Sequence, residues 1–345
     1  MDDTAQLSQA EAGWEAAAAL RGTPTVILIG LALLLAGVSF LIGPSGLAPH
    51  ELLHGLLTGQ GAAGVIAREI RLPRALMGLV VGGALGASGA ALQGLFRNPL
   101  AEPGVTGVTS AAGLGAIIAL YFGFAAISTW LLPGFAILGA LASALVLYLL
   151  SRVGAGATAL VLAGVAIASL TTALTALALS LTRNPYAMSE MVHWMMGSLN
   201  DVTLSDVAFA GPLSALGIAL LLSAARSLDA LVLGEEAAQS LGIDLHAARR
   251  RIIVGVALAT GAATAAAGAV SFVGLVVPHL LRRFYGCEPA RLLWPSAWGG
   301  AVLVLAADIA VRLVSPDQQL RLGVLTALLG APFFVFLIVR MRNEA

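Results

Sequence analysis

The sequence contains no lysine. Its 18 basic residues are all arginines, and they are balanced by 18 acidic residues, so the formal net charge is zero. A phosphate-binding loop of the G-x-x-x-x-G-K-[ST] type needs a lysine on the phosphates, and Schiff-base chemistry needs a lysine amine. Both kinds of site are therefore excluded. If ATP drives the work of this protein, another chain must hydrolyse it.

Cysteine is nearly absent as well, and this limits the possible metal sites. Cys287 is the only one, which excludes an internal disulfide and a cysteine-rich zinc site. Among the histidines, only His50 and His54 have a ligand spacing, and a third ligand is not evident. We therefore predict no resident metal and no stably bound cofactor.

Signatures of enzymes and of nucleic-acid-binding proteins are also missing. There is no nucleophile elbow, no triad order and no oxidoreductase fingerprint, and the Gly-x-x-x-Gly spacings lie within apolar runs, where they indicate helix packing. No polybasic block is present, which argues against a nucleic-acid partner. The sequence thus predicts a protein that is not itself an enzyme.

Long hydrophobic runs make up most of the chain, since 59% of its 345 residues are hydrophobic. A membrane-spanning helix uses about 20 apolar residues, so the chain has room for roughly ten of them. We predict an all-α polytopic membrane protein with one domain over residues 24–340, a cytosolic tail at 1–23 and a second tail at 341–345. The predicted spans are 24–42, 75–95, 105–122, 126–150, 157–181, 207–224, 252–267, 270–281, 296–314 and 322–339. The eighth is short and contains Pro278, so it is either a full crossing or a broken, re-entrant segment.

The distribution of arginines predicts the orientation in the membrane. With both termini in the cytosol, the inner connections hold 12 arginines and the outer ones hold six, which agrees with the excess of positive charge found on cytosolic loops. The six outer residues are Arg68, Arg71, Arg74, Arg183, Arg312 and Arg321.

Two connections are too long to be simple turns. The outer one, 43–74, includes a short amphipathic helix at residues 50–57. The inner one lies within residues 225–250 and contains an acidic helical turn that ends at glycine, over residues 233–244. Such a compact, solvent-facing knob is either a docking point for a cytosolic partner or an ordinary solvated loop, and the pattern alone favours neither.

Asp308 is a charged residue inside an otherwise apolar run. Insertion of such a carboxylate costs on the order of 2.5 to 3.5 kcal/mol, so it is expected to face protein rather than lipid. Arg312, one turn later, is the expected partner. The pattern favours a structural ion pair over a proton-binding site, but a proton-coupled secondary transporter that uses Asp308 is the alternative from another class.

Several strings together carry a resemblance to a known family. They are Arg-Leu-Pro-Arg at 71–74, Asn-Pro-Leu-Ala-Glu-Pro-Gly at 98–104, Leu-Val-Leu-Ala-Gly-Val-Ala at 160–166, Ser-Phe-Val-Gly-Leu-Val-Val-Pro-His at 271–279 and Leu-Gly-Ala-Pro-Phe-Phe at 329–334. The chain closely resembles the permease subunits of type II ABC importers, which take up ferric siderophores, haem and cobalamin. The likeness covers residues 24–340 and is slightly greater to the haem permeases.

The resemblance implies an assembly and a place in the cell. It implies a homodimer of ten-helix subunits in the bacterial cytoplasmic membrane, with the translocation path on the two-fold axis. Two ATPase subunits, which bind the ATP, would lie below it, and one periplasmic substrate-binding protein would dock above.

The same resemblance assigns roles to particular residues. The outer arginines Arg71, Arg74 and Arg312 match exposed residues that pair with glutamates of the binding protein, each contributing about 0 to 1 kcal/mol. Asn98, Leu100, Gly156 and Ala157 match a cytoplasmic gate. The acidic knob matches the helices that couple the permease to its ATPase: Leu233, Gly234, Glu235, Glu236, Ala237, Ala238, Gln239, Ser240, Leu241, Gly242, Ile243 and Asp244.

The expected cargo is a bulky metal chelate, with haem as the first choice. Arg183 and His193, on the outer side, are expected to meet haem propionates or iron along the path. A ferric siderophore and cobalamin are the alternatives on the same machinery. The chain departs from the family at Leu320-Arg321, where Leu-Pro is usual, which adds an outer arginine.

Overall fold

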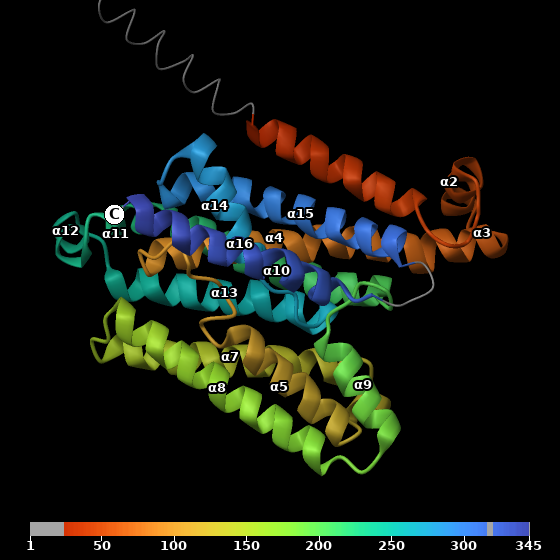
Figure 1. The fold of residues 1–345 in the computed structure, drawn as a ribbon, viewed down its shortest axis with the longest axis horizontal. Coiled ribbons are helices and arrows are strands. Elements are labelled where there is room, and N and C mark those ends of the chain that lie inside the picture. Colours follow the sequence, from red (N-terminus) through yellow and green to blue (C-terminus); the bar gives the residue numbers. More distant parts are fainter. Residues whose placement is uncertain (1–23, 316–319, 345) are drawn as a thin grey trace, which may run out of the picture.

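The computed structural model describes residues 24–315 and 320–344, and each regular element in those two ranges is a helix (Figure 1). The predicted N-terminal tail lies outside the described residues, and the predicted C-terminal tail falls mostly on the last helix, which continues to Glu344. A first helix spans Pro24–Leu41. The others are α2 (Pro49–Thr58), α3 (Gly61–Val65), η1 (Ile66–Arg71, a π-helix), α4 (Leu72–Leu95), α5 (Val108–Tyr121), α6 (Phe124–Ile127), α7 (Leu131–Arg152), α8 (Ala157–Leu181), α9 (Pro185–Met195), α10 (Leu204–Ser223), α11 (Ala225–Val232), α12 (Glu235–Ser240), α13 (Leu245–Ala267), α14 (Val273–Tyr285), α15 (Pro289–Val314) and α16 (Leu322–Glu344).

The all-helical fold class is confirmed, and a helix lies at the position of each predicted span. Seven helices of the described residues are long and apolar enough to cross a membrane, and two shorter apolar helices cover Val108–Tyr121 and Leu322–Leu337. The short eighth segment is α14, which has 13 residues and contains Pro278. The prediction for 126–150 was wrong at its start, because Ser128 has an extended backbone that separates α6 from α7.

Three helical regions outside the predicted spans were not predicted, and one of them is α11, which directly precedes the acidic turn. The helix α9 follows α8, and its start carries a signal that the sequence analysis overlooked: Asn184 caps the amide of Tyr186, and Pro185 occupies the first turn. In the outer connection, the predicted helix at 50–57 is confirmed as α2, but α3 and η1 run directly into α4. The wide π-helical turn precedes Pro73, whose missing amide hydrogen cannot continue an α-helical ladder.

The helices α4 and α13 form the centre of the molecule, and α15 packs along α4. Small residues allow this close approach. At Gly86 of α4, an added Cβ would collide with the carbonyl oxygen of Ser296 in α15, and at Gly89 it would collide with that of Gly274 in α14. The backbones of three helices therefore meet where side chains would not fit.

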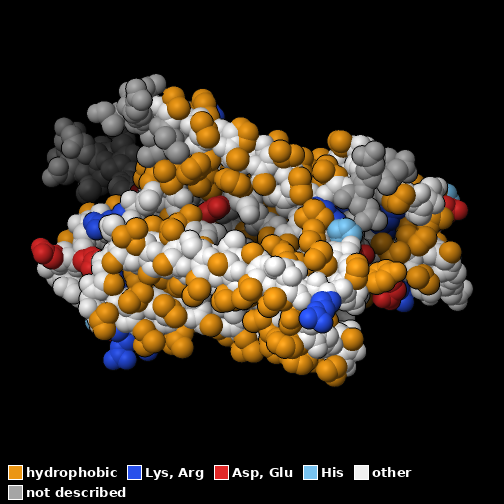
Figure 2. Space-filling view, turned by 60° about the horizontal axis from the view of Figure 1, so that its bottom comes forward, with side chains coloured by type: hydrophobic (Ala, Val, Ile, Leu, Met, Phe, Trp, Pro, Cys, Tyr) orange, Lys and Arg blue, Asp and Glu red, His pale blue; other side chains and the backbone are white. Residues whose placement is uncertain are grey.

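The remaining long helices surround this centre and present apolar side chains outward. The first helix, α8 and α10 are each mostly exposed along their apolar windows. Figure 2 shows hydrophobic side chains over the flank of the molecule, whereas charged side chains gather mainly toward its two ends. This distribution suits a protein surrounded by lipid along its length.

Contacts between helix ends define two opposite ends of the molecule. At one end, Arg249 of α13 pairs with Glu235 of α12, and the hydroxyl groups of Thr25 and Tyr285 lie 2.7 Å apart. At the other, Arg312 of α15 donates to the carbonyl of Ile42, just after the first helix. In Figure 1, α12 lies at the left end and α2 and α3 lie at the right end. We refer to these as the α12 end and the α2 end.

Candidate functional site

The predicted acidic knob is confirmed as a compact projection at the α12 end (Figure 1). The helix α12 begins after Gly234, with a φ of 107°, and the turn that follows it contains Gly242, with a φ of 80°. Both conformations favour glycine, because a Cβ disfavours positive φ. Ala238 is fully buried, whereas Leu233 and Leu241 are 68% and 64% exposed. The knob thus presents two apolar side chains outward from a fixed base.

Polar contacts attach this knob to the long helix that follows it. Arg249 Nη2 lies 2.6 Å from Glu235 Oε1. Asp244 caps α13 by accepting a hydrogen bond from the amide of Ala247 at 3.0 Å, and this bond is the main reason why the pKa of Asp244 is lowered. These contacts therefore join the knob to one of the two central helices.

At the α2 end, Asp308 joins two arginines from different helices. Arg74 Nη2 lies 2.7 Å from Asp308 Oδ1, and Arg74 Nε lies 3.0 Å from Oδ2. Arg312 Nη2 lies 2.9 Å from Oδ2. The Asp308 side chain is only 1% exposed. The predicted pair with Arg312 is confirmed, and Arg74 is a second partner that the sequence did not indicate.

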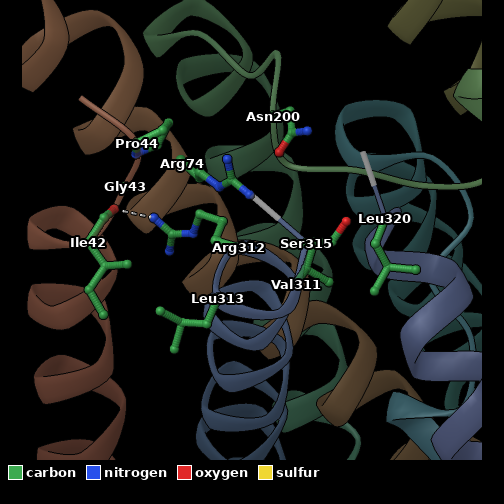
Figure 3. A pocket seen from close by; sticks show the side chains of 10 residues that line it. All are labelled: Ile42, Gly43, Pro44, Arg74, Asn200, Val311, Arg312, Leu313, Ser315 and Leu320. Carbon is green, nitrogen blue, oxygen red and sulfur yellow. Dashed lines mark hydrogen bonds between the residues drawn. The ribbon is translucent and has the colours of Figure 1, made fainter. Parts of the chain in front are cut away.

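Arg312 and Arg71 bind the chain that leaves the first helix. Arg312 donates to the carbonyl oxygens of Ser39 and Ile42 at 2.8 and 2.7 Å. Arg71 donates to Ser45 Oγ at 2.9 Å, but its Nη1 is buried with no hydrogen-bond partner among the described residues. A cavity of about 420 Å³ adjoins this cluster, and Figure 3 shows Arg74 and Arg312 on its wall with Asn200 beyond them.

The prediction that Arg71, Arg74 and Arg312 are exposed was therefore wrong for this chain. Arg71 is 4% exposed, and the side chains of Arg74 and Arg312 are 11% and 8% exposed. The physical reason is that Asp308 draws two of them inward and the main chain near residue 43 covers the third. Two guanidinium groups share the Asp308 carboxylate, and Arg71 adds a third positive charge that bonds to Ser45 instead, so the cluster keeps a positive charge beside the cavity.

The residues predicted for the substrate path are separated in the structure. His193 of α9 lines a cavity of about 480 Å³ together with Glu190, Asp201 and Arg321. Arg183, which is exposed in the link between α8 and α9, is not part of that lining. Arg321, expected as an additional outer arginine, is 8% exposed. Two acidic side chains thus share the cavity with one arginine and one histidine.

The predicted gate residues lie on two connections. Asn98 and Leu100 follow α4, where Asn98 Oδ1 accepts a hydrogen bond from the Leu100 amide at 2.9 Å. Gly156 is the exposed N-cap of α8, and Ala157 is its first residue. Within the described residues, no group of three or more histidine, cysteine, aspartate or glutamate side chains is arranged to hold a metal ion.

Glu102 is a functional candidate that the sequence reasoning missed. It lies in the same connection as Asn98, and its Oε2 accepts a hydrogen bond from the amide of Phe272, directly before α14, at 3.1 Å. Burial raises the pKa of Glu102 to about 7. Phe272 has a φ of 67°, which is uncommon for a bulky residue. An acidic residue within the quoted Asn-Pro-Leu-Ala-Glu-Pro-Gly string was the available signal.

The sequence of this chain is similar to those of several permease proteins of transport systems. The chain is 40% identical over 282 residues to the hemin transport system permease protein HmuU of Yersinia pestis, covering 80% of this chain and 84% of HmuU. It is 39% identical over 320 residues to the Fe(3+) dicitrate transport system permease protein FecD of Escherichia coli, covering 92% and 99%. It is 38% identical over 278 residues to the cobalamin import system permease protein BtuC of Halobacterium salinarum, covering 80% and 74%.

A solved structure extends the likeness to three dimensions. An inward-facing metal-chelate type ABC transporter superposes with a TM-score of 0.81 at 30% identity, covering 92% of this chain and 98% of that one. The model of the FecCD transport family matches residues 28–340, which is nearly the whole chain. The chain therefore belongs to the FecCD transport family.

Proposed function

We propose that this chain is the membrane permease of an ATP-driven importer that moves a metal chelate from the periplasm to the cytoplasm by alternating access. The observation that carries the proposal is the knob around α12, which presents Leu233 and Leu241 at one end of the helix bundle and is joined to the central helix α13 by the Glu235–Arg249 pair. A separate ATPase subunit supplies the ATP hydrolysis, since this chain has no lysine for a phosphate-binding loop.

The working unit in this proposal is a homodimer in the bacterial inner membrane. Each subunit has ten crossings, made by the seven long helices, α5, α14 and α16, with both termini in the cytosol. Two ATPase subunits bind the knobs at the α12 end. Asn98, Leu100, Gly156 and Ala157 form the cytoplasmic gate, which opens when the ATPase subunits move the knobs.

A periplasmic substrate-binding protein docks at the α2 end. Arg71, Arg74 and Arg312 attract its acidic side chains, because Asp308 neutralises only part of their charge. The two ion pairs of Asp308 favour this positioning role over the alternative of a proton carrier in a secondary transporter.

Haem is the proposed cargo, and a ferric siderophore or cobalamin is the alternative. HmuU, FecD and BtuC are named for hemin, ferric dicitrate and cobalamin, and their identities to this chain are similar. The choice therefore rests on His193, which lines the cavity of about 480 Å³, and on Arg183, which is exposed in the α8–α9 link outside that lining. Uptake of each chelate is measured with Arg183→Ala and His193→Ala. If haem uptake is unchanged in both variants, the assignment of haem to these residues is wrong.

The first experiment is the mass of the complex purified from its own membrane through a tag on this 34.9 kDa chain. Two copies together with two nucleotide-hydrolysing subunits are expected. If the chain is isolated without an ATPase, and if uptake stops when the proton gradient is dissipated at constant ATP, the ABC importer is excluded and the proton-coupled alternative through Asp308 gains support.

A further inference from the structure

A third pocket, of about 170 Å³, lies at the α12 end where α4, α11, α14 and α15 meet. Its lining includes Gln93, Arg97, Val232, Arg282 and Cys287. It is separate from the cavity beside Asp308 at the opposite end of the molecule and from the cavity that contains His193. The proposed transport function gives no role to its two arginines.

The fold holds Arg282 by hydrogen bonds and places Arg97, which is exposed, beside the knob. Arg282 Nη2 donates a hydrogen bond to Gln93 Oε1 at 2.8 Å, and Gln93 Nε2 in turn donates to the carbonyl of Gly274 at 3.3 Å. Arg97 follows α4 with a φ of 48°, a left-handed conformation. Its Nη1 lies near the start of α12, since a Cβ added at Gly234 would be 4.0 Å from it.

Among the residues that the structure describes, neither arginine has a carboxylate partner. The nearby acids are engaged elsewhere: Asp229 accepts from the amide of Ala290 at 2.9 Å, and Glu288 pairs with Arg291 at 2.6 Å. Arg282 Nε is also buried and has no hydrogen-bond partner in the described part of the chain. Buried donors are nearly always satisfied in folded proteins. The pocket therefore brings together two guanidinium groups that no carboxylate of the described residues neutralises.

We propose that Arg97 and Arg282 form a binding site for a phosphate group. Planar guanidinium groups match the oxygen geometry of phosphate, and two of them suit either free phosphate, which is largely doubly charged near neutral pH, or the singly charged phosphodiester of a lipid. The phosphate comes either from an anionic lipid headgroup or from free phosphate in the cytosol. Basic pockets between helices on the cytosolic side of a membrane typically take headgroups. Phe284 and Trp294, which lie two positions along the chain from the lining residues Arg282 and Leu292, are 57% and 44% exposed and are aromatic residues of the kind found at membrane interfaces.

A phosphate bound here would connect the ends of α4 and α14 to the base of the α12 knob. The site thus lies at the joint through which the proposed ATPase movement passes. Its existence does not depend on the transport function, because binding is measured without substrate or ATP.

Binding is tested with the full chain, together with any subunits that remain attached, in nanodiscs of phosphatidylcholine alone or with added phosphatidylglycerol. Radiolabelled inorganic phosphate is titrated, and native mass spectrometry counts the phospholipids that each chain retains. We expect one phosphate group per chain and a roughly tenfold or greater loss of affinity in Arg97→Gln, since a charge-assisted hydrogen bond is removed. Arg283→Gln is the matched control, because Arg283 is on the same helix as the pocket residue Arg282 but stacks on Phe284 outside the pocket lining.

The two lipid compositions distinguish the sources of the phosphate. Retained phosphatidylglycerol that excludes labelled phosphate identifies a headgroup site, whereas equal phosphate binding in both nanodiscs identifies a free anion. Cys287, the only cysteine, gives a second measurement, since an occupied pocket should slow its modification by an anionic thiol reagent. The proposal is overturned if the Arg97→Gln and Arg283→Gln variants bind equally, or if phosphate binds only after the ATPase is removed, which would mark the pocket as a site for an ATPase carboxylate.

Discussion

Asp308 and Glu102 are both acidic residues within an apolar chain, but their surroundings differ. Asp308 receives hydrogen bonds from two guanidinium groups, which compensate the cost of burying its charge. Glu102 receives one from a backbone amide, and burial dominates its titration. Asp308 is therefore expected to contribute to stability through its two ion pairs, and Glu102 in its protonated form.

Asp308→Asn should be strongly destabilising. It leaves Arg74 and Arg312 buried without a counter-charge, and removing one partner of a buried pair costs about 3 to 5 kcal/mol. The free energy of unfolding, measured by titration with a denaturing detergent, should fall by that amount. Glu236→Gln is the control, because Glu236 is exposed on the knob and should change stability by less than about 0.5 kcal/mol. Equal effects of the two substitutions would contradict the structural role of the cluster.

Because the pKa of Glu102 is raised in the folded protein, we expect the free energy of unfolding to decrease as the pH rises. The pKa of Glu102 is about 7 in the folded protein against 4.5 ordinarily, so the folded state holds this proton longer than the unfolded state. The free energy of unfolding should therefore fall between about pH 4.5 and pH 7 and then level off, by about 3 kcal/mol in total. Unfolding of Glu102→Gln, followed over the same pH range, should lack this decrease. If the free energy of unfolding of this variant falls with pH as steeply as that of the wild type, other groups cause the pH dependence.

The helix contacts divide into two kinds, which differ in their tolerance of substitution. In the centre, α4, α14 and α15 approach each other through glycine positions that leave no room for a Cβ. At the α12 end, the short α12 carries exposed leucines on a buried base. Substitutions in the first region should change stability, and those in the second should change interactions with a partner.

Gly86→Ala and Gly83→Ala should affect stability differently, although both glycines lie in α4. A Cβ at position 86 would overlap the carbonyl oxygen of Ser296, and overpacking of this kind costs about 1 to 3 kcal/mol. At position 83 the nearest atom is the carbonyl oxygen of Ala297 at 3.7 Å. There, alanine should be neutral or stabilising by up to about 1 kcal/mol, because it is the better helix former. Detergent unfolding of both variants measures the difference, and equal midpoints would argue against the α4–α15 contact.

Leu241→Asp should disrupt the proposed contact between the knob and the ATPase without destabilising the fold. Leu241 is 64% exposed, so the substitution should change the free energy of unfolding by less than about 0.5 kcal/mol. The ATPase subunits should nevertheless be lost from the purified complex, because a charge replaces an apolar contact. Val153→Asp is the control, since Val153 is 80% exposed on the α7–α8 connection. Retention of the ATPase by Leu241→Asp would exclude a contribution of this side chain to coupling.

The whole molecule has two chemically different ends joined by an apolar flank. Charged contacts at the α2 end involve Arg74, Arg312 and Asp308, and those at the α12 end involve Glu235, Arg249 and the pocket arginines. The predicted orientation places the α12 end in the cytosol. The chain's only cysteine is exposed at that end, which allows the orientation to be tested directly.

Cys287 should react with a membrane-impermeant maleimide in inverted vesicles and remain unreactive in intact spheroplasts. In a Cys287→Ser background, a cysteine introduced at His50 in α2 should show the opposite pattern, because His50 is exposed at the α2 end. Labelling is measured by the mass of the modified chain. Reaction of Cys287 from the periplasmic side would reverse the orientation and move the docking and coupling roles to the opposite ends.

The sequence by itself determined the helical fold class, the positions of the apolar helices, the α12 knob and the Asp308–Arg312 pair. These are local properties, since apolar run length, glycine stops and a spacing of four residues are all contained in short segments. The start of α9 is also encoded locally, by the capping residue Asn184 and by Pro185 in the first turn.

Only the tertiary structure decided which polar side chains are buried and which partners they contact. Arg74 and Asp308 are separated by 234 positions, Gln93 and Arg282 by 189, and Glu102 and Phe272 by 170. No spacing rule connects such residues, because their proximity results from the packing of α4 against α14 and α15. For the same reason the arginines proposed for docking, which the sequence predicted to be exposed, are buried in the folded chain.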